Sequence, residues 1–221
     1  PDMPALLEGL AWQAGRWGAQ MLLADVEERS AFFEALRRAG FSVYAGQRVW
    51  RLAAAAAPAH AALWRQASGA DVVPAYGLYQ GLVPPMVQRA ESFPRLRSLH
   101  LAYRQEGEML AYVEVIEGNQ GIFLQPYIHP QVDNVRELLD GLAAQPRWQG
   151  KPLYLAVRSY QAWLEPLLEE MQSTTAPRQA LLVKYLVVAQ RAAVPAREVK
   201  TSEQPAAPAY NVSMDPVKGP G

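Results

Sequence analysis

The chain has 221 residues, half of them are hydrophobic, and its 21 Lys and Arg residues balance 21 Asp and Glu residues. A chain of this length and apolar content can bury a sizeable core in one or two domains. Zero net charge provides no field that would recruit nucleic acid, so we expect no nucleic-acid partner. The absence of cysteine excludes disulfides, thiolate nucleophiles and cysteine metal sites.

No apolar run reaches the roughly 18 residues that cross a membrane, and the N-terminus lacks the charged-then-apolar pattern of a secretory signal. We therefore expect a cytoplasmic protein with no membrane span. The three histidines, His60, His100 and His129, are scattered along the chain, so no metal site is predicted.

Hydrophobic periodicity predicts helix, strand, helix and strand in the first 52 residues. The expected elements are a helix over 4–16, a strand over 20–26, a helix over 28–39 and a strand over 42–51. Gly40 suits the left-handed stop that often follows a helix. An alanine run interrupted by Pro58 comes next, and we interpret residues 53–61 as a linker.

A longer α/β pattern occupies residues 62–190. We expect a strand and turn over 63–73, one or two helices over 74–92, a strand over 98–104, a hairpin with its loop at Glu117–Gly121, a helix at Val135–Leu142, a strand at Pro152–Val157, a helix at Tyr160–Met171 and a strand at Ala180–Val188. The glycines of the hairpin loop tolerate the positive φ that tight turns require. Residues 191–221 are rich in Pro, Ala, Lys and Glu, a composition typical of an extended or disordered tail.

Part of the sequence occurs twice. Residues 6–13 match residues 138–145 at six of eight positions, an offset of 132 (138 minus 6). With the offset reduced by one, Leu22 and Val26 align with Leu153 and Val157. We interpret the first 52 residues as a copy of the last part of the second segment; two unrelated leucine-rich helices are the alternative.

The order of strand, hairpin, strand, proline and helix resembles the centre of the GNAT (Gcn5-related N-acetyltransferase) superfamily. In that family the fourth strand ends near a proline, and the next helix presents its N-terminus to the pyrophosphate of acetyl-coenzyme A. Ile128-His129-Pro130 would be that strand end and Val135–Leu142 that helix. The resemblance implies an α/β fold with a mixed, largely antiparallel sheet flanked by helices. It implies one complete domain at 62–190 and the C-terminal half of another at 1–52.

The resemblance also implies acetyl-coenzyme A as a cofactor. Its contacts would be Ile128 at the strand end and Asn134, Val135 and Arg136 at the helix start. GNAT enzymes usually carry glycines in the loop between these elements, because backbone N–H groups must approach the pyrophosphate closely. Residues 131–136 contain no glycine and include Asp133, which favours a capped helix and opposes a polyphosphate.

Two residues are candidates for catalysis. The tyrosine that GNAT enzymes use as general acid falls on Leu36, or on Leu167 in the repeat, and neither can transfer a proton. Tyr160, nearby on the same expected helix, is the substitute; its alternative role is a tyrosine at the edge of the core. His129 could take a proton from an amine near neutrality, and its alternative role is structural.

Two functions therefore remain open. One is transfer of an acetyl group from acetyl-coenzyme A to a small-molecule or protein amine. The other is a catalytically silent GNAT-like module that acts as an interaction or assembly subunit. The first copy lacks the part equivalent to residues 62–134. Either those residues precede Pro1 in a longer protein, or the first copy packs on the complete domain, self-associates or binds a protein partner. Phe32, Phe33 and Trp50 would lie at that junction.

Overall fold

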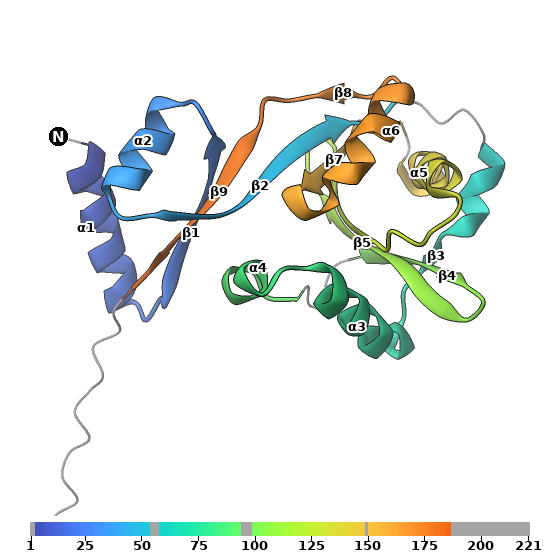
Figure 1. The fold of residues 1–221 in the computed structure, drawn as a ribbon, viewed down its shortest axis with the longest axis horizontal. Helices are drawn as coiled ribbons and strands as arrows, with labels where there is room; N and C mark the ends of the chain where they lie inside the picture. The colour runs from blue at the N-terminus through green and yellow to red at the C-terminus, as the bar shows by residue number, and fades with distance from the viewer. Residues whose placement is uncertain (1–2, 54–57, 94–98, 149, 187–221) are drawn as a thin grey trace, which may run out of the picture. The chain divides into compact units, whose positions relative to one another are not determined.

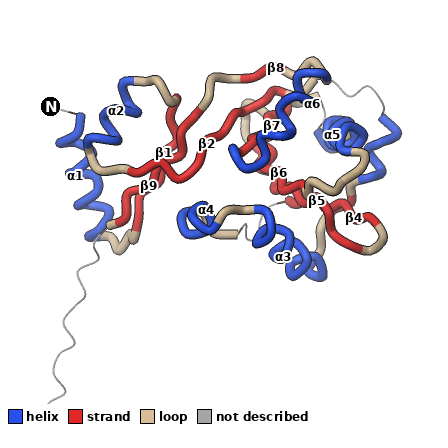
Figure 2. The backbone as a smooth tube through the Cα atoms, viewed as in Figure 1, coloured by secondary structure: helices blue, strands red, loops and turns tan. Residues whose placement is uncertain are grey.

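The helical and alternating patterns of the sequence produce most of the expected elements (Figure 1, Figure 2). The helix expected at Tyr160–Met171 is instead a 3-10 helix at Ser159–Leu164 followed by an α-helix at Glu165–Glu170. The computed structural model describes residues 3–53, 58–93, 99–148 and 150–186, which belong to one compact unit. The predicted tail at 191–221 lies outside the described residues. Within the described part of the chain, no helix is both long and apolar enough to cross a membrane.

The α-helices are α1 (Met3–Arg16), α2 (Ala31–Arg38), α3 (Val72–Leu82), α4 (Pro85–Ala90), α5 (Val135–Ala143) and α6 (Glu165–Glu170). Short 3-10 helices are η1 (Pro58–Leu63), η2 (Gly69–Asp71), η3 (Pro146–Trp148) and η4 (Ser159–Leu164). The strands are β1 (Met21–Glu27), β2 (Ser42–Arg51), β3 (Arg65–Gln66), β4 (Leu99–Gln105), β5 (Glu108–Glu117), β6 (Ile122–Ile128), β7 (Leu153–Arg158), β8 (Thr174–Thr175) and β9 (Gln179–Tyr185).

Local chemistry explains where several elements begin and end. The Ser30 hydroxyl caps α2 by accepting a hydrogen bond from the Phe33 N–H, and Gly40 follows that helix with a φ of 82°. The hairpin between β5 and β6 turns where the sequence predicts it. Gly121 at its end has no room for a side chain, because a Cβ there would lie 2.6 Å from the Pro152 carbonyl oxygen.

The strands form one sheet in the order β1-β9-β2-β7-β6-β5-β4-β3, with β8 paired to β2. The β6–β7 pair is parallel and the other pairs are antiparallel. The expected mixed, largely antiparallel sheet flanked by helices is therefore confirmed.

The two ends of the chain interleave in this sheet. Strand β9 lies between β1 and β2, and β2 lies between β9 and β7. Gln47 pairs with Gln179, which follows it by 132 residues, and the two amides share a hydrogen bond of 2.8 Å. The last part of the second segment, with α5, β7, α6 and β9, repeats the order helix, strand, helix, strand of α1, β1, α2 and β2, with the short η3, η4 and β8 added. This order supports the interpretation as a repeat, which stays a prediction.

The expected boundary at residues 53–61 does not divide the sheet, because β2 continues it into the second segment. Residues 58–61 are not a free linker: they form most of η1, which packs on α5. The Gln145 side chain donates to the Ala61 carbonyl oxygen at 2.7 Å. A Cβ on Gly141 would overlap the His60 carbonyl oxygen, so η1 and α5 are in close contact.

Helices cover both faces of the sheet. In β9, Ala180 and Leu182 contact the core under α2, whereas Leu181 and Val183 contact the core under α3 and α4. The largest core lies under α5 and α6 and contains Trp50, which is 1 % exposed and pairs with Leu155.

The residues expected at the junction between the two segments lie in different places. Trp50 lies there, at the β2–β7 pair. Phe33 is partly buried in the separate core beside α2, and Phe32 is 57 % exposed, so neither takes part in the strand pairing that joins the two segments. The reason is that β9 and β7, strands of the same chain, complete the first segment's sheet through backbone pairing. A place for Phe32 at a contact with another chain stays a prediction.

Candidate functional site

Strands β6 and β7 separate part-way along their length. They pair in parallel from Ile122 with Leu153 to Leu124 with Leu155, and the pairing stops there. The next part of β6 contains Pro126, which has no N–H to offer a neighbouring strand. An open edge of β6 therefore faces the end of β7.

The side chain of Gln161 fills this opening. Its Oε1 accepts a hydrogen bond from the Ile128 N–H at 2.8 Å, and its Nε2 donates to the Pro126 carbonyl oxygen at 2.8 Å. Gln161 is 1 % exposed and has a non-helical φ of −118° within η4. The backbone groups that the separated strands expose are thus satisfied by one buried amide.

The N-terminus of α5, the expected phosphate site, is surrounded by polar side chains of the chain itself. Asn134 is the N-cap residue, but its side chain does not cap the helix. It accepts from the Tyr103 hydroxyl at 3.3 Å and donates to Glu137 at 3.1 Å. Asp133 accepts from Gln105 at 3.3 Å. Two carboxylates, Asp133 and Glu137, therefore lie in or beside the first turn.

The other predicted cofactor residues have different surroundings. The Arg136 guanidinium forms a 3.7 Å ion pair with Glu170, and both side chains are more than half exposed. Val135 packs on the large core, and Ile128 is fully buried, with its N–H bound to Gln161. Val135 and Arg136 lie at the start of α5 and Ile128 at the end of β6, as expected for their position in the chain.

His129 lines a pocket of about 430 Å³ between α3 and the turn that joins β4 to β5. Its Nδ1 accepts a hydrogen bond from the Gln131 N–H at 3.2 Å. Its own N–H donates to the Leu110 carbonyl oxygen at 2.8 Å, which extends the β5–β6 ladder by one residue. His129 therefore combines a structural backbone role with a side chain at the wall of a pocket.

Tyr160, the second predicted catalytic residue, belongs to a different environment. It is partly buried against the core under α3 and α4, on the 3-10 helix η4. Burial raises its pKa above the ordinary value, and the nearby Arg158 acts in the opposite direction. Tyr160 does not line the pocket of His129.

A polar cluster beside Tyr160 has no counterpart in the sequence analysis. Glu91 forms an ion pair with Arg158 at 3.0 Å and also accepts from the Tyr44 hydroxyl. The Tyr79 hydroxyl donates to the Glu91 backbone carbonyl oxygen at 2.8 Å, and burial raises the pKa of Tyr79 to about 12. These residues are far apart in the chain, so no spacing signal could have revealed them.

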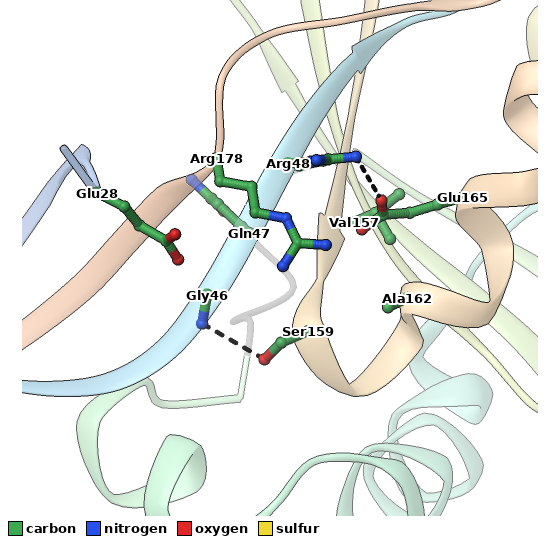
Figure 3. Close-up of a pocket in the computed structure, with 9 residues that line it drawn as sticks. All are labelled: Glu28, Gly46, Gln47, Arg48, Val157, Ser159, Ala162, Glu165 and Arg178. Carbon is green, nitrogen blue, oxygen red and sulfur yellow. Dashed lines mark hydrogen bonds and ion pairs between the residues drawn. The ribbon is translucent and has the colours of Figure 1, made fainter.

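A further pocket, of about 270 Å³, lies over the junction of β2 and β7 (Figure 3). Arg48 is held there by Glu165 at 2.9 Å, and the Gly46 N–H donates to the Ser159 hydroxyl at 3.4 Å. The Arg178 guanidinium points into the pocket opposite Glu28. The pocket contains none of the predicted site residues.

Solved structures with the same arrangement of elements decide the fold. A functionally unknown conserved protein from Staphylococcus epidermidis has a TM-score of 0.57 at 13 % identity, over 85 % of this chain and 82 % of its own. A GCN5-related N-acetyltransferase from Kribbella flavida has a TM-score of 0.54 at 12 % identity, over 82 % and 74 %. A tandem GNAT protein from the clavulanic acid biosynthesis pathway has a TM-score of 0.51 at 14 % identity, over 82 % of this chain and 69 % of its own.

The chain has the GNAT fold. No protein-family model matches the sequence, and no curated protein matches it. The chain is thus a divergent form of the GNAT fold. Among the described residues, no group of His, Cys, Asp and Glu side chains could hold a metal ion.

Proposed function

We propose that this protein is a catalytically silent GNAT-fold module whose role is protein–protein interaction. The observation that carries the proposal is the bond pattern of Gln161, which occupies both the Ile128 N–H and the Pro126 carbonyl. The Ile128 N–H, a strand donor of the kind that can stabilise a tetrahedral intermediate, is therefore already bound within the chain. A ligand that used these groups would first have to displace a fully buried side chain.

The start of α5 supports the same proposal. A helix N-terminus stabilises a bound pyrophosphate when its backbone N–H groups are free and no negative side chains lie nearby. Here Asp133 and Glu137 lie beside that terminus, and Arg136 is paired with Glu170. The residues present therefore do not fit acetyl-coenzyme A, and we derive no acetyl-transfer step.

Titration calorimetry with acetyl-coenzyme A tests the proposal. We expect no saturable heat. Binding with a low-micromolar dissociation constant, about −8 kcal/mol, would overturn it.

An activity measurement complements the titration. Acetyl transfer to an amine releases the coenzyme A thiol, and the chain has no cysteine to give a background signal. We expect no thiol release above the protein-free rate with a panel of small amines and lysine peptides. Turnover that His129→Ala or Tyr160→Phe abolishes would instead support an acetyltransferase that uses the two predicted catalytic residues.

A further inference from the structure

Helix α1 exposes an unusual number of large apolar side chains. Met3, Leu6 and Leu10 on the helix are 38 %, 52 % and 53 % exposed, and Trp17, directly after its last residue, is 78 % exposed. Their spacing, three, four and seven residues, places them on one stripe, which we call the α1 seam. Monomeric proteins rarely leave such a contiguous apolar stripe in water.

The second segment shows how the equivalent residues behave when they are covered. At the offset of 132, Leu6 and Leu10 correspond to Leu138 and Leu142, and both of the latter are fully buried. There the Trp64 indole donates to the Leu138 carbonyl oxygen at 2.7 Å, and η1 lies against the helix. In the described residues nothing equivalent covers α1. The seam is therefore half of a core.

The chemistry of the seam favours another helix as its cover. Positions 3, 10 and 17 repeat every seven residues, and Leu6 and Gln13 lie between them, which is the a/d pattern of paired helices. The charged residues of α1 are Glu8 and Arg16, and neither lies on the seam; Arg16 instead stacks over Trp12 at 4.8 Å. Two copies of the seam can thus meet without like charges in contact.

The open edge of strand β1 is a second surface that could pair with its own copy across a two-fold axis. It is the last strand of the sheet and pairs with β9 alone among the described strands. Two copies related by a two-fold axis would present β1 to β1 in antiparallel order, the commoner type of strand pair. A strand that paired with β1 as β6 pairs with β7 would run parallel to β1. No other described strand of this chain longer than two residues is available for that, because each of them already has two neighbours.

We infer that the α1 seam is the contact between two copies of this chain, with the two α1 helices packed antiparallel about a two-fold axis near Leu10. The inference rests on the proposed interaction role, but its test has a separate readout. Titration with acetyl-coenzyme A addresses catalysis and mass measurement addresses association, so either proposal can fail alone.

Light scattering of the purified full chain at micromolar concentration tests the contact. We expect twice the chain mass of 24.4 kDa. Leu10→Glu should return the mass to that of a monomer, because a carboxylate at the centre of an apolar seam meets its own copy. Val73→Glu is the matched control: Val73 is 80 % exposed on α3, and its change should leave the dimer intact.

Crosslinking provides a second measurement that does not rely on a destabilising charge. Since the chain has no cysteine, Leu10→Cys introduces a single thiol. Mild oxidation should link Leu10→Cys into covalent dimers and leave Val73→Cys unlinked. A monomeric wild-type chain would overturn the inference, as would a dimer that Leu10→Glu does not weaken and Leu10→Cys does not crosslink.

Discussion

At the scale of single residues, buried polar side chains determine what the separated strands can do. Gln161 gives both of its amide atoms to the backbone of β6. An unsatisfied buried N–H or C=O costs about 1–3 kcal/mol, so this amide stabilises a separation that would otherwise need water or a ligand. The candidate site is thereby closed by the chain itself, which is the physical basis of the proposed silence.

Asp71 is a second buried polar residue, at the start of α3. It is 1 % exposed and accepts hydrogen bonds from Arg65, from Arg104 and from the Ser68 N–H and hydroxyl. The Arg65 hydrogen bond, with those from Ser68 and Arg104, holds the pKa of this carboxyl well below its usual range despite burial. Its ionised form thus links strands β3 and β4 to the helix.

The lowered pKa of Asp71 predicts acid sensitivity. A group whose pKa is lower in the folded state contributes stability above its unfolded value of about 4, and loses it as pH falls further. The free energy of unfolding, measured in urea, should therefore decrease as the pH is lowered below about 4. Asp71→Asn should cost on the order of 2 kcal/mol at pH 7 and flatten this acid dependence. Glu8→Gln, at an exposed position, should change neither; an unaltered acid profile in Asp71→Asn would contradict the assignment.

At the scale of elements, η1 packs on α5 and so bounds the largest core on that side. Trp64 and Trp148 donate to the Leu138 and Leu142 carbonyl oxygens at 2.7 and 2.6 Å. Gly141 lets the η1 backbone approach α5, since a Cβ would overlap the His60 carbonyl. The segment before the second α/β pattern is therefore a structural part of the core.

Gly141→Ala tests this contact. The added methyl group meets backbone atoms, which cannot move aside without shifting η1, so we expect a loss of about 1–3 kcal/mol in the free energy of unfolding. Gly77→Ala is the control. It lies in α3, where an added Cβ would meet nothing within 4 Å, and alanine should stabilise that helix by about 0.5–1 kcal/mol. Equal effects of the two changes would show that η1 does not press on α5.

At the scale of the whole molecule, interleaved strands join the two segments into one folding unit. Strand β9 from the end of the chain separates β1 from β2, and its two faces contribute to two different cores. Neither segment can lose its strands without exposing the backbone of the other. Cooperative unfolding follows from that arrangement.

Unfolding in urea should accordingly occur in one transition, with coincident curves from circular dichroism and tryptophan fluorescence. Leu182→Ala, which removes a fully buried side chain of β9, should destabilise that single transition by about 2–5 kcal/mol in free energy. Two transitions, of which Leu182→Ala shifts one, would mean that the segments fold independently.

The sequence by itself determined the elements, their order and the family resemblance. The expected helix over 4–16 is α1 at Met3–Arg16, and the expected strand over 42–51 is β2 at Ser42–Arg51. These predictions succeed because periodicity, caps and turn residues act over a few neighbouring positions. Pro126 also carries a local signal, since a strand proline marks an edge without a partner.

Tertiary structure alone decided the strand partners and the composition of the candidate site. That β9 enters between β1 and β2, that Gln161 binds β6, and that His129 and Tyr160 face different surroundings depend on contacts between residues distant in the chain. Strands pair through backbone N–H and C=O groups that nearly every residue has. The sequence pattern therefore indicates where a strand lies more clearly than which other strand it pairs with. Leu6 and Leu138 are identical residues at the 132-residue offset, yet one is half exposed and the other fully buried, because the elements that pack on the two helices differ.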